Sequence, residues 1–299
     1  MATLITVVGP TGIGKTALSI QLARYFNTEI ISCDSRQFYR EMPIGTAVPD
    51  DKERASIPHH FIQSRSITEA YNVGRFEKDA LTTLTTLFKK YKIVIMVGGS
   101  GLYVDAVLKG LDHFPDVDKT IRKKLIADLH KFGIEHLQDQ LRKLDRISYK
   151  TIAIDNPQRL IRALEVCLST GLPYTTFKSK PKEPRPFTSV KIGLTADREI
   201  IYRRINERVT KMMENGLLEE VKQLLPYRKL NALQTVGYKE LFLYLEGKTS
   251  LEEAISEIKK NTRRFAKRQL TWFRKDTSVI WFDYLTDPDE ISSKIAAKL

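Results

Sequence analysis

Apolar runs alternate with amphipathic stretches through the first third of the chain. The runs predict buried strands over residues 3–8, 29–33 and 92–97. The stretches that follow them carry apolar side chains at helical spacing and predict helices over residues 15–26, 75–90 and 102–108. Strands that alternate with helices favour a mostly parallel sheet covered by helices on both faces. We therefore expect an α/β fold.

The pattern changes after the third of these helices. Residues 112–150 are charged and helical and contain no strand, so we interpret them as an all-helical insert. Asn156 and Pro157 are typical of an N-cap and a first helical position, and they predict a helix that ends near residue 169. A link rich in Pro and Lys is expected over residues 178–186.

The last part of the chain returns to the core. We expect a strand over residues 190–194, helices over residues 198–225, 238–246 and 250–274, and a short strand over residues 279–282. The expected division is an α/β core of residues 1–111 and 151–299, whose C-terminal helices are basic, with the helical insert between its two parts.

A glycine-rich segment follows the first strand directly. Residues 9–16 read Gly-Pro-Thr-Gly-Ile-Gly-Lys-Thr, which matches G-x-x-x-x-G-K-[ST] between a strand and a helix. In this geometry backbone N–H groups and the helix N-terminus hold a polyphosphate, the charge of Lys15 adds to them, and the Thr16 hydroxyl suits Mg²⁺. We favour a phosphate-binding loop in a P-loop NTPase-like core over an ordinary glycine turn. The motif leaves the phosphate compound open.

Two further segments end strands of the same sheet. Asp34-Ser35 follows the second strand, and Gly98-Gly99-Ser100-Gly101 follows the third, so both are expected to share a crevice with the loop. Asp34 is a candidate general base; a helix N-cap or an outer metal contact are its alternatives. The third strand lacks the terminal Asp with which nucleotide hydrolases hold Mg²⁺, which disfavours a hydrolase and leaves a kinase open.

Charge points to a polyanionic partner. The 299 residues carry a formal net charge of +13, with a pI near 9.5. Residues 259–275 contain eight basic side chains and no acidic one, with Phe265, Trp272 and Phe273 between them. A solvated helix face usually mixes signs, so this run favours contact with nucleic acid.

Other side chains allow two interpretations. Arg208 lies beside an apolar helical stripe and suits an anion clamp or a surface position. Gln158 and Arg162 share a helix face that meets either phosphate or water. Three tyrosines suit stacking on a base or plain packing, with packing favoured: Tyr39, Tyr103 and Tyr238.

The sequence shows no targeting or metal framework. No apolar run approaches about 18 residues, and no signal peptide is recognised, so we expect a cytoplasmic, monomeric protein without a membrane partner. Cys33 and Cys167 form no C-x-x-C pair, which suits a reducing compartment. His59 and His60 are interpreted as a loop and not as a metal site.

Taken in order, these motifs resemble the tRNA dimethylallyltransferases (tRNA isopentenyltransferases) of bacteria, over most of the chain. The resemblance is carried by Gly9-Pro10-Thr11 to Lys15-Thr16, Asp34-Ser35-Arg36-Gln37-Phe38-Tyr39-Arg40, Ile44-Gly45-Thr46-Ala47, Pro58-His59-His60, Gly98-Gly99-Ser100-Gly101-Leu102-Tyr103, Asn156-Pro157-Gln158-Arg159-Leu160-Ile161-Arg162-Ala163-Leu164-Glu165, Arg204 through Arg208 to Met212 and Gly216, Val236-Gly237-Tyr238, and Lys267-Arg268-Gln269-Leu270-Thr271-Trp272-Phe273-Arg274. Ile13 and Ser100 depart from commoner choices, and Ser100 keeps a hydroxyl. The zinc-finger extension of eukaryotic relatives is not expected.

The resemblance implies transfer of a dimethylallyl group from dimethylallyl diphosphate to N6 of adenosine 37 of tRNA. It assigns the diphosphate to Gly9, Pro10, Thr11, Gly12, Ile13, Gly14, Lys15, Thr16 and Arg208, with Mg²⁺ near Thr16. Asp34 would accept the amine proton, with Lys15, Thr16 and Arg208 as the other catalytic residues. Contacts to the tRNA anticodon stem-loop, which the insert would embrace, are implied for Asp34, Ser35, Arg36, Gln37, Ser100, Arg122, Gln158, Arg159, Leu160, Ile161, Arg162, Gln234, Thr235, Val236, Gly237, Tyr238, Lys239, Lys267, Arg268, Gln269, Leu270, Thr271, Trp272, Phe273 and Arg274.

Three other functions fit parts of the sequence. A small-molecule or nucleoside kinase would use the loop with ATP and leave the basic run unexplained. A transferase acting on free adenine nucleotides would share the loop and Asp34 but would not require the helical insert. A non-catalytic RNA-binding module would not need Asp34.

Overall fold

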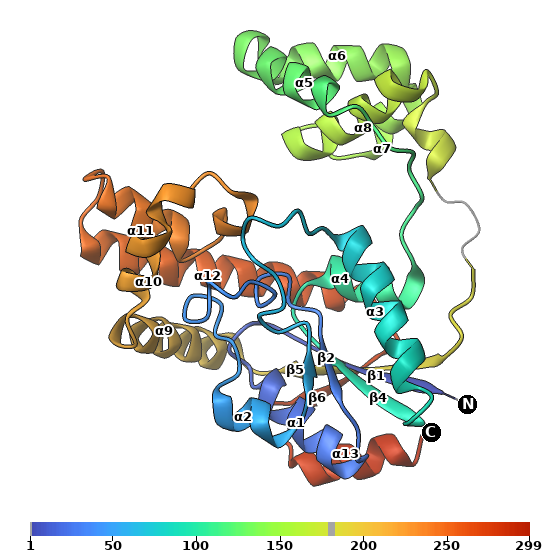
Figure 1. Ribbon diagram of the computed structural model, residues 1–299, viewed down its shortest axis with the longest axis vertical. Helices are drawn as coiled ribbons and strands as arrows, with labels where there is room; N and C mark the ends of the chain where they lie inside the picture. Colours follow the sequence, from blue (N-terminus) through green and yellow to red (C-terminus); the bar gives the residue numbers. More distant parts are fainter. Residues whose placement is uncertain (1, 179–182) are drawn as a thin grey trace. The chain divides into compact units, whose positions relative to one another are not determined.

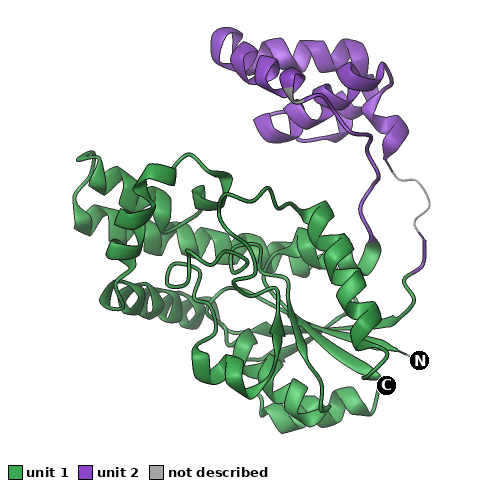
Figure 2. Cartoon of the chain, viewed as in Figure 1, with its two compact units in different colours: residues 1–109, 185–299 green, residues 110–184 purple. Residues whose placement is uncertain are grey.

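A computed structural model describes residues 2–178 and 183–299 (Figure 1). The chain forms two compact units, residues 1–109 with 185–299 (unit 1) and residues 110–184 (unit 2), shown in Figure 2. Residues 179–182 of the expected Pro/Lys-rich link lie outside the described residues. No helix in the described ranges has the length and apolar character needed to cross a membrane.

Unit 1 is built on a sheet of six strands, all parallel, in the order β3-β2-β4-β1-β5-β6. The strands are β1 (Thr3–Val8), β2 (Ile30–Ser32), β3 (His59–His60), β4 (Ile93–Val97), β5 (Thr188–Thr195) and β6 (Val279–Asp283). In the central register Ile5 of β1 lies opposite Ile95 of β4 and Val190 of β5. The mostly parallel sheet predicted from the alternating pattern is confirmed.

Helices cover both faces of this sheet (Figure 1). Ile5 and Val7 of β1 belong to the core cluster on one face, with α1 (Lys15–Tyr25), α9 (Arg198–Glu214) and α13 (Pro288–Ala296). Leu4 and Val8 point to the opposite face and its cluster, with α3 (Val73–Leu87) and α4 (Gly101–Lys109). The alternation follows from the two-residue repeat of a strand.

A helical part of unit 1 lies beside the sheet. It contains α10 (Leu217–Leu224), α11 (Tyr238–Leu245), the 3₁₀ helices η2 (Leu225–Tyr227) and η3 (Asn231–Leu233), and the long α12 (Leu251–Phe273). The helix expected over residues 198–225 is two helices, because Gly216 takes a φ of 95° between α9 and α10. Ser250 and Glu253 form a capping box that starts α12.

Other elements also differ from the sequence analysis. Helices α2 (Asp51–Ser56) and α13 were not predicted. The expected loop at His59 and His60 is the edge strand β3, which pairs with β2 and is fixed by a hydrogen bond between His60 Nε2 and Glu29 Oε2 of 2.7 Å. A two-residue strand is too short to leave a periodic signal.

Unit 2 is a helical bundle larger than the expected insert. Its helices are α5 (Lys119–Phe132), α6 (Ile134–Leu144), α7 (Arg146–Thr151), α8 (Pro157–Thr170) and the 3₁₀ helix η1 (Tyr174–Phe177). The expected boundary at residue 150 is corrected to 184, because Leu160 and Leu164 of α8 pack on Leu125, Leu137 and Leu141. Helix α8 therefore contributes to the core of this unit.

We expect Gly45→Ala to destabilise unit 1 by about 1–3 kcal/mol, as overpacking of a close-packed core does. A Cβ on Gly45 would lie 2.5 Å from the hydroxyl of the fully buried Tyr238, which donates a hydrogen bond to Glu220. Denaturant unfolding measures the change. Gly74→Ala is the control, since its Cβ would meet only Asn72 Oδ1, at 3.5 Å. Equal stability of the two variants would contradict the expectation.

Candidate active site

The glycine-rich loop has the backbone of an anion cradle. Gly9, Gly12 and Gly14 take φ angles of 141°, 80° and 111°, which side chains rarely adopt. A Cβ on Gly9 would lie 2.7 Å from the carbonyl oxygen of Leu194 in β5, so only glycine fits there. Gly14 caps α1 without a side-chain hydrogen bond, which leaves the first N–H groups of that helix to an anion.

Basic side chains converge on this loop. Lys15 Nζ donates to the Pro10 carbonyl oxygen at 2.8 Å, and Arg204 Nε donates to that of Gly12 at 2.8 Å. Arg208 Nη1 lies 3.4 Å from Thr11 Oγ1. Burial lowers the pKa of Lys15 to about 8, although the negative charge of Asp34 raises it, and burial also lowers the pKa of Arg208. Half-buried cations with few partners suit an anionic ligand.

The lowered pKa of Lys15 predicts that anion binding depends on pH. Lys15 is protonated below about pH 8 in the free site, so affinity for a diphosphate ligand should fall as pH rises through that value. The affinity should fall by up to about tenfold per pH unit, because the protonated fraction of Lys15 changes about tenfold per unit above its pKa. Calorimetric titration between about pH 7 and about pH 9 measures it. Lys15→Arg should abolish this dependence; a constant affinity of the wild-type protein would contradict the assignment.

Asp34 follows β2 and faces the same crevice. Its Oδ1 accepts the backbone N–H of Arg36 at 3.0 Å, in a turn and not at a helix start, so the N-cap alternative is wrong. Within residues 2–178 and 183–299, no hydrogen bond reaches Oδ2. A half-buried carboxylate with an unengaged oxygen can accept a proton from a ligand.

Gln269 of α12 joins two of the strand ends. Its Oε1 accepts the N–H of Thr11 at 2.9 Å, and its Nε2 donates to the Gly99 carbonyl oxygen at 2.9 Å. Ser100 Oγ, beyond the end of β4, accepts the N–H of Ser35 at 3.2 Å and so joins the end of β2, the third strand end, to the other two. The predicted convergence of the three strand ends is therefore confirmed. They line a cavity of about 410 Å³ with Arg36, Gly45, Thr46, Leu102, Tyr103, Ile205, Val209, Met212, Leu217, Thr235, Val236, Gly237, Ile258, Thr262, Phe265, Arg268 and Trp272.

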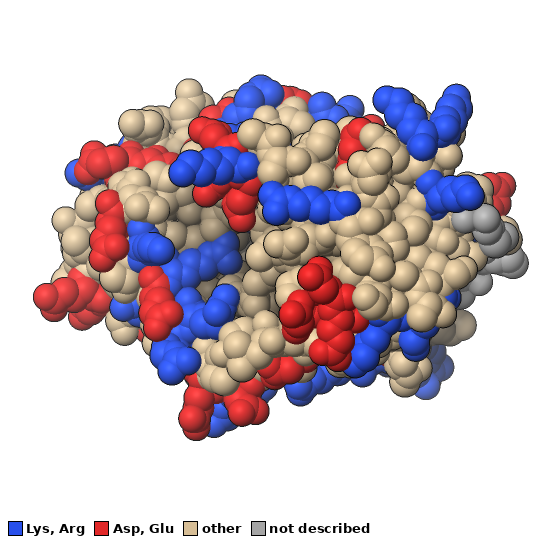
Figure 3. All heavy atoms as spheres, turned by 90° about the horizontal axis from the view of Figure 1, so that it is seen from below, with Lys and Arg blue, Asp and Glu red and all other residues tan. Residues whose placement is uncertain are grey.

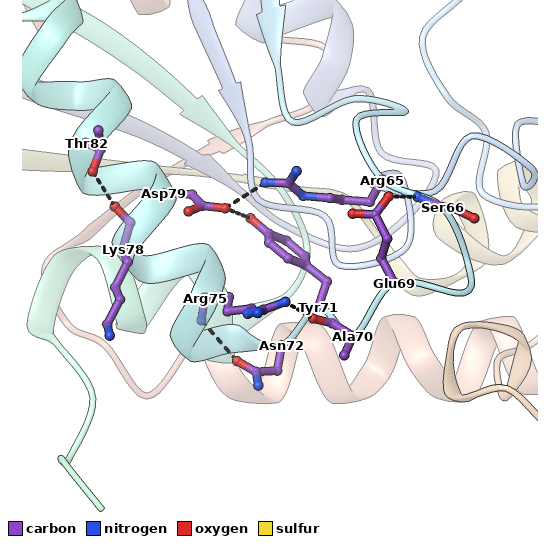
Figure 4. A network of polar contacts seen from close by, with 10 residues as sticks. All are labelled: Arg65, Ser66, Glu69, Ala70, Tyr71, Asn72, Arg75, Lys78, Asp79 and Thr82. Atoms are coloured by element: carbon purple, nitrogen blue, oxygen red, sulfur yellow. Dashed lines mark hydrogen bonds and ion pairs between the residues drawn. The ribbon is translucent and has the colours of Figure 1, made fainter. Parts of the chain in front are cut away.

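Arg65 links the segment that follows Asp34 to α3, and Figure 4 shows its side chain directed at Asp79 of that helix. Arg65 exchanges backbone hydrogen bonds with Phe38 and Arg40 at 2.9 Å each. The Arg65 guanidinium donates to Asp79 Oδ2 at 2.8 Å, and the Tyr71 hydroxyl donates to the same oxygen at 3.0 Å. Burial raises the pKa of Tyr71 above its ordinary value, so this phenol stays a donor. These hydrogen bonds fix Phe38 and Arg40, in the segment that follows Asp34.

Several of the residues predicted to contact tRNA have side chains that are buried or hydrogen-bonded within the protein. The side chains of Leu160, Ile161, Tyr238 and Phe273 are buried in hydrophobic clusters, and Gln269 is taken up by Thr11 and Gly99. These side chains pack within the protein, and contact of these residues with tRNA stays a prediction. Gln37 and Gln234 bond to backbone carbonyl groups of their own loops. Lys239, Lys267, Arg268, Thr271, Trp272 and Arg274 are exposed in unit 1.

Arg122, Gln158, Arg159 and Arg162 belong to unit 2. Arg122 donates to Glu165 and Gln158 at 2.7 and 3.1 Å, and Arg162 donates to Glu165 at 2.6 Å. A hollow of about 350 Å³ is lined by Thr151, Ile152, Gln158, Arg159, Arg162, Tyr174 and Lys178, with no acidic residue.

Sequence reasoning missed some of the site. Glu220 accepts the N–H groups of Ile44 and Gly45 at 2.8 and 2.9 Å and so holds one wall of the cavity. Arg204 lies one helical turn before Arg208, a spacing that could have indicated a paired clamp. Basic and acidic side chains are mixed on the face in Figure 3, so this face is not uniformly positive.

Comparison with known proteins agrees with this geometry. The model of the IPP transferase family matches residues 37–276. The tRNA dimethylallyltransferases of Christiangramia forsetii and Flavobacterium johnsoniae are 58% and 55% identical, over 99% and 100% of this chain and 98% and 99% of theirs. The tRNA isopentenylpyrophosphate transferase of Bacillus halodurans superposes with a TM-score of 0.75 at 40% identity, over 100% of this chain and 97% of its own. A eukaryotic dimethylallyltransferase acting on tRNA superposes with a TM-score of 0.83 at 29% identity, over 99% of this chain and 78% of its own. The chain belongs to the IPP transferase family.

Proposed function

We propose that this protein transfers a dimethylallyl group from dimethylallyl diphosphate to N6 of adenosine 37 in tRNA. The observation that carries the proposal is a cavity lined by both the phosphate-binding loop and Asp34, whose Oδ2 has no hydrogen bond from the described residues. Membership of the family and the names of the relatives support the same reaction.

The first requirement of this reaction is a stabilised leaving group. The allylic C–O bond breaks, and the diphosphate departs with the electron pair. In our proposal the loop N–H groups, Lys15 and Arg208, which lie together at the loop, stabilise this charge. Fixed donors at such a position lower the barrier, because they need no reorganisation during the reaction.

The second requirement is a nucleophile. The exocyclic amine of adenine is weak, and it gains strength if its proton leaves as the C–N bond forms. Asp34 Oδ2 accepts that proton in our proposal. The adenine must first leave the anticodon stack, since the carboxylate lies at a cavity wall.

A magnesium ion fits this site in a limited way. No group of three or more His, Cys, Asp or Glu side chains is arranged for a metal within the described ranges. Thr16 is the second residue of α1 and lies beside the loop, where a hydroxyl and the diphosphate oxygens suit an ion that keeps several waters. When bound, Mg²⁺ would neutralise part of the diphosphate charge.

Two basic surfaces support tRNA as the acceptor. Arg159, Arg162 and Lys178 line the hollow of unit 2, and exposed basic side chains follow α12 from Arg264 to Arg274. Such surfaces bind RNA through its phosphates, and the affinity falls steeply with salt. We propose that unit 2 binds the anticodon stem and α12 the loop.

A comparison of donors and acceptors tests the proposal. The purified protein is incubated with dimethylallyl diphosphate or ATP, and with unmodified tRNA or AMP, and the nucleosides are analysed by mass spectrometry. Prenylated adenosine should form only from dimethylallyl diphosphate and tRNA. ATP consumption without prenylation would indicate a kinase, and prenylated AMP would indicate a transferase for free nucleotides.

A further inference from the structure

Trp272 is held at two points although its side chain is partly exposed. It lines the active-site cavity and is 41% exposed. The edge of the indole lies on Gly101, since a Cβ there would be 2.3 Å from Cδ1 of the ring. The indole Nε1 donates to Asp105 Oδ2 at 3.1 Å. Gly101 and Asp105 are one turn apart on α4, so the ring lies along one face of this helix.

Asp105 is itself fixed by a chain of charges. Lys109 Nζ lies 2.9 Å from Asp105 Oδ1 and 3.5 Å from Asp276 Oδ2. Asp276 pairs with Lys191 of β5, whose side chain is only 10% exposed. The carboxylate that accepts the indole N–H is therefore anchored to the central sheet through alternating charges.

Asp105 does not line the active-site cavity, whereas Trp272 does. In sequence, Trp272 comes after a run of exposed cations on α12 that includes Lys267 and Arg268. Aromatic rings between cations are the usual platform for an unstacked RNA base. A ring held in one orientation loses less entropy when a base stacks on it.

We propose that Asp105 is a positioning residue, which fixes the Trp272 indole as a stacking platform for a base of the tRNA acceptor. The inference rests on the proposed function. Asp105→Ala should raise KM for tRNA about 5- to 20-fold, within the range typical of the loss of one base stack. The kcat and the KM for dimethylallyl diphosphate should stay within about twofold, since the diphosphate loop is untouched.

Three variants separate positioning from a general structural role. Asp105→Asn keeps an oxygen that accepts the indole N–H and should restore KM for tRNA. Trp272→Phe keeps a ring without the N–H group, so adding Asp105→Ala to it should change nothing further. Glu290→Ala breaks a comparable exposed i,i+4 pair, with Lys294 on α13, and should leave KM unchanged. Circular dichroism checks that each variant folds.

Fluorescence gives a readout that does not depend on turnover. The chain contains two tryptophans, so a Trp281→Phe background isolates Trp272. Quenching of Trp272 by added tRNA should be strong when Asp105 is present and weaker in the Asp105→Ala variant. Unchanged KM and quenching in Asp105→Ala, or additive effects in the double variant, would overturn the inference. Failure of the wild-type protein to modify tRNA would instead overturn the proposed function.

Discussion

Asp34→Asn should lower kcat for transfer to tRNA by about 10²–10⁴-fold, the range typical of a general base. Asparagine has nearly the same shape and still accepts the Arg36 N–H, so the turn at the end of β2 is kept. It cannot take the proton from N6 of adenosine, so the C–N bond forms at the barrier of an unassisted amine. Single-turnover assays with bound tRNA measure the chemical step directly.

The Asp34 prediction has two controls. Binding of tRNA to the variant should stay within a few-fold of wild type. Asp50→Asn changes an exposed helix cap in the same unit and should leave the rate unchanged. Normal transfer by Asp34→Asn would remove this carboxylate from the mechanism and favour a binding module.

Lys15→Met should reduce kcat/KM for dimethylallyl diphosphate by about 10²–10³-fold, as loss of one preorganised donor at a developing charge does. The methionine side chain has similar length and no charge, so it removes the cation together with its hydrogen bond to the Pro10 carbonyl oxygen. Steady-state kinetics with varied donor measure the effect, and Lys89→Met on the surface is the matched control. An unchanged kcat/KM would show that the diphosphate binds outside the loop.

The local pattern predicted most of the sheet and the loop, for a physical reason. Residues 3–8 and 93–97 are buried on both faces, so they read as continuous apolar runs. The phosphate-binding loop depends on glycines at positive φ, which leave a direct signature at positions 9, 12 and 14. Both features are local in sequence.

Features that depend on distant contacts were not predictable in this way. The role of Glu220 rests on backbone groups about 175 residues earlier, and a surface glutamate has the same local sequence appearance. Helix α8 was expected in the core but belongs to unit 2, because its leucines pack against those of α5 and α6. Burial of Tyr238 and Phe273 likewise depends on which helices meet.

The central claim is that the loop holds a prenyl diphosphate with Asp34 beside the acceptor amine. A crystal structure with an unreactive analogue of dimethylallyl diphosphate and an anticodon stem-loop tests it most directly. We expect the diphosphate on the N–H groups of residues 12–16 and N6 of the flipped adenine within hydrogen-bond distance of Asp34 Oδ2. A loop filled by a nucleoside triphosphate, with Asp34 turned away from the acceptor, would contradict the account.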